Sequence, residues 1–194
     1  MVETITPAVH GGSRRRYRMS AALHALGATG SAAALGTVLG GVGALLGAPW
    51  GYGGAIAVAV VAAAYALREL LGVPIPIPDR RRQVPDWWRT FFSPHTSALL
   101  YGLGLGVGFL TFLSFGTFVV VALAALASGN PFVGLTLCAP FGAARAVAVI
   151  LARKAIDAEQ AARIVDDLQR AGRSRGPGVV NGVALAAIAV AAAL

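Results

Sequence analysis

A long uncharged stretch in the middle of the chain constrains its fold more than any other feature. It runs from Thr96 to Gly129 and reads TSALLYGLGLGVGFLTFLSFGTFVVVALAALASG, without one acidic or basic residue. A helix needs about 20 apolar residues to cross the hydrocarbon core of a bilayer. These 34 residues exceed one straight span and fall short of two spans joined by a turn. The stretch therefore predicts one long tilted helix, a helix broken around a site, or a re-entrant pair.

The composition of the whole chain is typical of a multi-span membrane protein. Hydrophobic residues make up 57% of it, charged residues 12%, and its mean hydropathy is +0.72. The net charge of +8 does not indicate nucleic-acid binding, because the basic residues cluster between apolar runs as membrane topology requires. We therefore predict an all-α polytopic helix bundle in the inner membrane. We expect the bundle to contact lipid, and the sequence also allows binding to a partner membrane protein or to a second copy of the chain.

Apolar runs and basic clusters divide the chain into six segments with about five spans. They are a basic N-terminal segment (1–20), a first helix pair (21–71), an interfacial loop (72–95), a second helix pair (96–152), an amphipathic helix with a linker (153–178) and a last span (179–194). The Arg-rich segments follow the positive-inside rule if the N-terminus is cytoplasmic. Five spans then place the C-terminus outside.

The loop between the helix pairs carries a compact aromatic group. Its members are Trp87, Trp88, Phe91 and Phe92, and they surround Arg89. Such rings settle in the headgroup layer while an Arg head reaches water. The group therefore predicts an interfacial anchor, with a partner-binding surface as the alternative.

Two parts of the chain look alike and predict an internal repeat. Residues 23–31 (LHALGATGS) align with residues 100–108 (LYGLGLGVG), and the turn GAPW at 47–50 aligns with GNPF at 129–132. Each unit would be a glycine-rich long helix, a turn and a second helix. Repeats of this kind place a site near the midplane of the membrane.

The glycine-rich run from Tyr101 to Gly116, continued by SGNPFVG at 128–134, resembles the transmembrane cytochrome c biogenesis family, which includes CcdA and the central domain of DsbD. The resemblance implies a helix bundle in which one cysteine beside a proline, in the first helix of each repeat, passes electrons across the membrane. Here the corresponding positions, near 33–39 and 111–117, contain neither Cys nor Pro. Cys138 is the only cysteine, so thiol–disulfide exchange within the chain has no second sulfur. The resemblance thus implies the scaffold without the redox pair.

Arg145 is the most informative single residue. It lies eight residues before Arg153, roughly 12 Å inside the end of its apolar run at about 1.5 Å per residue. A charge at that depth is costly and points to function, although an Arg near a helix end can also extend to the interface. We expect Arg145 to act with the small and hydroxyl residues that mark the helix break. Those residues are Thr111, Ser114, Gly116 and Thr117.

These features predict a protein that is not an enzyme and has no cofactor and no metal site. The sequence contains no Ser/His/Asp set, no phosphate loop and no zinc spacing. The first functional hypothesis is a transporter-like scaffold that handles a small solute, with an anion as one option, through the glycine-rich broken helix and Arg145. The second is a structural subunit of a membrane complex, and the third is a CcdA/DsbD-like role in thiol redox or cytochrome c maturation.

Overall fold

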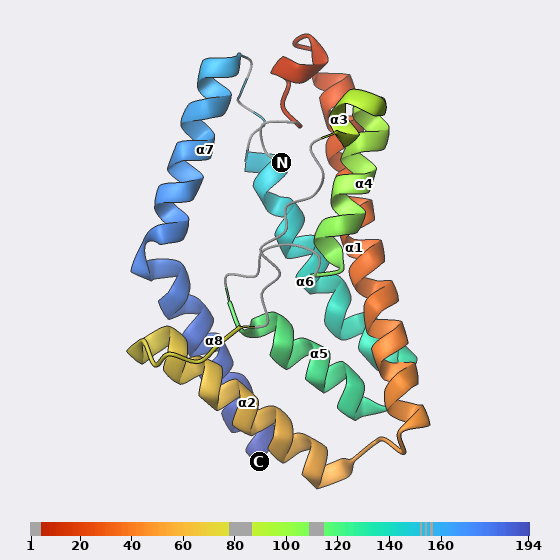
Figure 1. Ribbon diagram of the computed structural model, residues 1–194, viewed down its shortest axis with the longest axis vertical. Coiled ribbons are helices and arrows are strands. Elements are labelled where there is room, and N and C mark those ends of the chain that lie inside the picture. The colour runs from red at the N-terminus through yellow and green to blue at the C-terminus, as the bar shows by residue number, and fades with distance from the viewer. Residues whose placement is uncertain (1–4, 78–86, 109–114, 152, 154, 156) are drawn as a thin grey trace.

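The computed structural model describes residues 5–77, 87–108, 115–151, 153, 155 and 157–194, and the regular elements among them are helical (Figure 1). In chain order they are η2 (Ala8–His10), α1 (Arg14–Leu45), α2 (Gly51–Leu71), α3 (Trp88–Phe91), α4 (Pro94–Gly106), α5 (Thr117–Ser128), α6 (Pro131–Leu151), α7 (Ala158–Arg173) and α8 (Arg175–Ala193). In the described part of the chain, α1, α2, α6 and α8 are long and apolar enough to cross a membrane. The chain is therefore an all-α, multi-pass membrane protein, and this part of the prediction is confirmed.

The helices form two groups that share α5. In Figure 1, α1, α4 and α6 lie side by side, whereas α2 and α5 are strongly inclined to α1 and α4, and α8 crosses behind α2. Helix α5 contacts α1 and α6 in the first group and α2 in the second. Helix α7 stands apart in the view and joins the rest through α8.

The first group packs backbone against backbone at glycines. A Cβ atom added to Gly36 of α1 would collide with the carbonyl of Gly134 in α6, and one added to Gly134 would collide with the carbonyl of Gly36. Gly102 and Gly106 of α4 lie equally close to carbonyls of α1. Helices can approach this closely only where side chains are absent, and small residues spaced by four allow it. The group is therefore built on main-chain contact.

The second group packs through side chains instead. Its buried cluster consists of Val58, Ala62, Tyr65 and Ala66 of α2, Val120 of α5 and Leu185 of α8. Leu185 and Ala62 are completely buried there. Branched and aromatic side chains fill the space between these helices.

The two ends of the first group differ in charge as the segment pattern predicted. At one end, the Tyr17 hydroxyl donates to the Val149 carbonyl (2.8 Å), which brings the basic start of α1 beside the end of α6. At the other end lie the uncharged turns, where the Trp50 amide donates to the Ala127 carbonyl (3.3 Å). Which of these ends faces the cytoplasm stays a prediction.

The central stretch contains two helices, and neither reaches the length of a span. Helix α4 ends at Gly106 and α5 begins at Thr117. Gly108 has a φ of 72°, in the left-handed region, which ends a helix rather than continuing it. Residues 109–114 lie outside the described residues, so the broken span, the re-entrant pair and the internal repeat stay predictions.

Two helix boundaries differ from the sequence expectation. Helix α1 begins at Arg14, inside the segment predicted to precede the first span, because the Ser13 side chain accepts from the Arg16 amide and caps it. Helix α8 begins at Arg175, before the predicted start of the last span at residue 179. Pro177 lies in its first turn, where a missing amide hydrogen costs no helical bond. This extension makes α8 long enough to span.

Candidate functional site

Arg145 lies on α6 against an aromatic pair. Its guanidinium carbon is 5.6 Å from the centroid of the Phe141 ring, one helical turn earlier. The Phe141 ring packs on Phe118 of α5 at 5.3 Å between centroids. A guanidinium over a ring face is a favourable cation–π arrangement, more so away from water. The structure thus connects half-buried Arg145 to the first turn of α5 through two aromatic rings.

The predicted helix-break residues are only partly described. Thr111 and Ser114 lie outside the described residues. Gly116 precedes α5, and a Cβ atom added to it would collide with the ring of Tyr65 in α2. The Thr117 hydroxyl donates to the side-chain oxygen of Asn181 in α8. Gly116 and Thr117 therefore join α5 to α2 and α8, whereas Phe118 joins it to α6 and Arg145.

The sequence placed Arg68 and Glu69 near the end of an apolar run, but it did not predict Tyr65 or the contacts of these three α2 residues with each other and with the following loop. The Tyr65 hydroxyl donates to the Pro76 carbonyl (3.2 Å), and Arg68 Nε donates to the Ile75 carbonyl (2.9 Å). Arg68 also pairs with Glu69 at 2.6 Å, and the Glu69 side chain is only 6% exposed. These side chains tie the loop after α2 back onto the helix. Their position at the end of an apolar run was the available signal.

The aromatic group of the interfacial loop lies beside the first turns of α4. Trp88 is half-buried, with its ring 5.8 Å from Tyr101, and its carbonyl accepts from Ser97 Oγ (2.9 Å). Trp87, Phe91 and Phe92 remain exposed, by 52%, 79% and 40%. Trp87 contacts Phe91 edge to face at 5.7 Å. Helix α3 therefore presents a small aromatic surface fixed by Trp88, and Arg89 lies within that helix.

Cys138 is buried between α6 and α1, 3% exposed, beside Gly36. Among the described residues, no three His, Cys, Asp or Glu side chains lie together in a way that could hold a metal ion. Cys138 therefore packs at a helix interface.

Comparison with known proteins relates the chain to one group of curated proteins. It is 36% identical over 129 residues to methylamine utilization protein MauF of Paracoccus versutus, covering 64% of this chain and 46% of that protein. To MauF of Methylophilus methylotrophus it is 34% identical over 140 residues, covering 71% and 49%. To MauF of Methylorubrum extorquens it is 36% identical over 135 residues, covering 67% and 46%.

The chain is thus a membrane protein distantly homologous to MauF, and it spans about half the length of these relatives. No protein-family model matches it, and no solved structure gives a significant match.

Proposed function

We propose that this chain is a non-catalytic structural component of a membrane assembly that serves methylamine utilization. The observation that carries the proposal is the similarity to MauF over about two thirds of the chain. The name of those relatives indicates methylamine utilization as the process. The glycine-packed group α1/α4/α6 supports a structural role in it. A bundle held by main-chain contact is a rigid body suited to presenting a fixed surface.

The charges near the first turn of α5 give no support to a carrier of methylamine. Methylamine is a methylammonium cation at neutral pH. Arg145, which meets the Phe141 ring in this region, has a charge of the same sign. The buried carboxylate of Glu69 is paired with Arg68.

The exposed aromatic residues of α3 are the proposed docking surface. Trp87 and Phe91 have large exposed rings, and their backbone is held through Trp88 and Ser97. Aromatic residues on a rigid support are frequent energetic centres of protein interfaces. We propose that they lie at the cytoplasmic headgroup layer, as the positive-inside rule requires of the neighbouring basic segments.

Growth on methylamine tests the proposal in a strain that lacks the gene and expresses variants of the full chain. The wild type is expected to restore growth on methylamine, with no effect on ammonium and succinate. Trp87→Ala/Phe91→Ala is expected to fail, whereas Tyr52→Ala/Phe132→Ala is expected to restore growth. The control pair has similarly exposed aromatic rings, 73% and 71%, on other helices.

Arg145→Ala separates the structural role from transport. A structural component retains function in this variant, whereas a carrier that uses Arg145 loses uptake of radiolabelled methylamine while folding is intact. Full rescue by Trp87→Ala/Phe91→Ala together with lost uptake in Arg145→Ala would overturn the proposal in favour of transport. Unchanged growth on methylamine after deletion of the gene would also overturn it.

The resemblance to the CcdA/DsbD type is tested with Cys138→Ser in the same strain. Because Cys138 is buried and is the chain's only cysteine, we expect normal growth and unaltered periplasmic thiol reduction. A loss of either would support a thiol role for Cys138 with a sulfur from another chain.

A further inference from the structure

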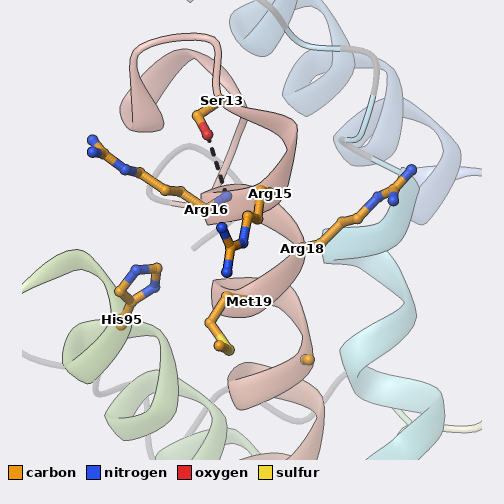
Figure 2. A pocket seen from close by; sticks show the side chains of 7 residues that line it. Ser13, Arg15, Arg16, Arg18, Met19 and His95 are labelled. Atoms are coloured by element: carbon orange, nitrogen blue, oxygen red, sulfur yellow. Dashed lines mark hydrogen bonds between the residues drawn. The ribbon is translucent and has the colours of Figure 1, made fainter.

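A basic pocket lies at the beginning of α1, away from the residues discussed above (Figure 2). It has a volume of about 620 Å³ and is lined by Ser13, Arg15, Arg16, Arg18, Met19, Ala22 and His95. In Figure 2, Arg16 extends to the side of His95 and Arg18 to the opposite side, while Arg15 lies between them above Met19. A second pocket of about 320 Å³ adjoins it and shares Arg16 and His95.

The described residues place three arginines, Arg15, Arg16 and Arg18, in this pocket and pair none of them with a carboxylate. The first turn of α1 adds the positive end of the helix dipole. The pocket therefore favours an anion.

A buried histidine is a second and independent sign of a ligand. His10 lines the adjoining pocket and is only 5% exposed. Its Nε2 atom is buried and has no hydrogen-bond partner among the described residues. A buried polar atom without a partner is costly, and a bound group would satisfy it. The His10 ring is 5.8 Å from that of His95, between centroids, so it borders the shared part of the two pockets.

The depth of the pocket in the bilayer indicates what kind of anion it meets. Helix α1 has 32 residues and is about 48 Å long, whereas the hydrocarbon core is about 30 Å thick. Its basic first turns therefore lie in the headgroup layer. Below them the outer face of α1 is apolar, with Met19 58% exposed and Leu26 67% exposed about two turns further along. An acyl chain can lie along that face.

We propose that this pocket binds the phosphate headgroup of an anionic phospholipid, with the arginines of the first turns of α1 on the phosphate and an acyl chain along Met19, Ala22 and Leu26. Arg15 and Arg16 present guanidinium forks, which match phosphate oxygens in pairs. His95 borders the headgroup from α4. The site is independent of the methylamine-linked role, because neither Trp87 nor Arg145 lines it.

The test compares the lipids that the full chain retains. The wild type and variants are placed in nanodiscs of phosphatidylcholine and phosphatidylglycerol, roughly four to one, and bound lipids are counted by native mass spectrometry. The wild type is expected to be enriched in phosphatidylglycerol. Each Arg replaced by Gln at 15 or 18 should lower the enrichment about fivefold.

Two further variants control for topology and for net charge. Arg15→Lys/Arg18→Lys keeps the charges that orient the protein and should lose part of the enrichment, because Lys lacks the paired donors. Arg163→Gln/Arg170→Gln removes two charges from α7, as many as Arg15→Gln/Arg18→Gln removes from α1, and should keep the enrichment. Circular dichroism and melting temperature identify any variant that fails to fold.

Free phosphate shares the chemistry of the headgroup, so a second arm separates the two ligands. In detergent, millimolar inorganic phosphate should neither stabilise the wild type against heat nor displace retained phosphatidylglycerol. The proposal is overturned if the Gln variants at 15 and 18 keep the enrichment, or if the α7 control loses it equally. Stabilisation by phosphate without any lipid preference would assign the pocket to the free ion and overturn it as well.

Discussion

The two helix groups of this protein solve the same packing problem in opposite ways. In α1/α4/α6 the helices meet at glycines such as Gly36 and Gly134, where main chain lies on main chain. In α2/α5/α8 they meet at side chains such as Val58, Val120 and Leu185. Both groups are rich in apolar residues, so hydrophobicity alone does not distinguish them.

The difference shows what can hold helices together in a bilayer. Lipid tails are as apolar as Leu, so burial away from lipid contributes little, and close van der Waals contact and polar bonds decide. The glycine group gains contact over long lengths of backbone but has no space for an added atom. The side-chain group depends on filled volume and on bonds such as that between Thr117 and Asn181. The stability of the glycine group should therefore fall when a side chain is added, and that of the side-chain group should fall when a side chain is shortened.

The largest effect should come from adding a side chain within the glycine group. Gly36→Leu forces α1 away from Gly134 and Cys138, whose atoms occupy the space of the new Cβ. We expect a loss of about 3 kcal/mol or more in the free energy of unfolding, at the upper end of overpacking effects. Reversible unfolding in micelles measures it.

Gly30→Leu is the matched control, because Gly30 is on the same helix and nothing lies within 4 Å of an added Cβ. It should be neutral or slightly stabilising, as Leu favours helix over Gly. Equal destabilisation by both variants would contradict main-chain contact as the basis of this group.

The next effect should come from removing a side chain in the second group. Leu185→Ala empties a fully buried position between α8 and its neighbours and should cost about 2 kcal/mol, mainly through the cavity. The same unfolding experiment measures it. Val183→Ala on the same helix, where the side chain is 57% exposed, should change stability little. If the two changes cost the same, filled volume does not hold this group.

A smaller effect is expected from the polar bond that joins α5 to α8. A double-mutant cycle with Thr117→Val and Asn181→Leu should give a coupling free energy of about 0.6 kcal/mol, the average for such bonds between membrane helices. Additive single effects would show that this bond contributes nothing to holding the two helices together.

The smallest effect concerns the N-terminal segment that packs onto the charged end of the glycine group. Burial, and then the positive potential of His95 and Arg16, lower the pKa of His10 below its ordinary 6.5. The folded segment thus favours neutral His10. Its stabilisation is complete above about pH 6.5 and is lost as the pH falls through the lowered pKa.

Hydrogen exchange of the Ala8 amide reports this change, because that amide donates to the Ala155 carbonyl (3.2 Å). Its protection factor should fall between pH 7 and pH 5 in the wild type. The fall should vanish in His10→Gln, and a fall of equal size in that variant would assign the effect to another group.

Local sequence features predicted the helical elements well because their causes are local. Apolar length determined the spans, and the uncharged turn before Pro131 marked a helix end. The prediction was less accurate for α8, because Ala-rich sequence is only mildly apolar and the helix extends over residues 175–178. Among the candidate site residues, Arg145 and Thr117 were chosen because a charged or hydroxyl group within the hydrocarbon core has a free-energy cost, which points to a specific role.

What the sequence by itself determined is a membrane helix bundle, with charge at one end and small residues spaced for close approach. Those properties follow from residue type and periodicity along one helix. Only the tertiary structure decided that α1 packs with both α4 and α6, and that α5 packs with α2 as well as with the glycine group. It also showed that Phe141, which Arg145 meets, packs on Phe118, and that Arg15 and His95 share a pocket. Such contacts join residues far apart in the chain, and no periodicity within a single helix encodes which face meets which. The two described helices of the uncharged central stretch accordingly pack with different neighbours: α4 contacts α1 and α6, and α5 contacts α2 as well. The residues of that stretch alone did not predict these neighbours.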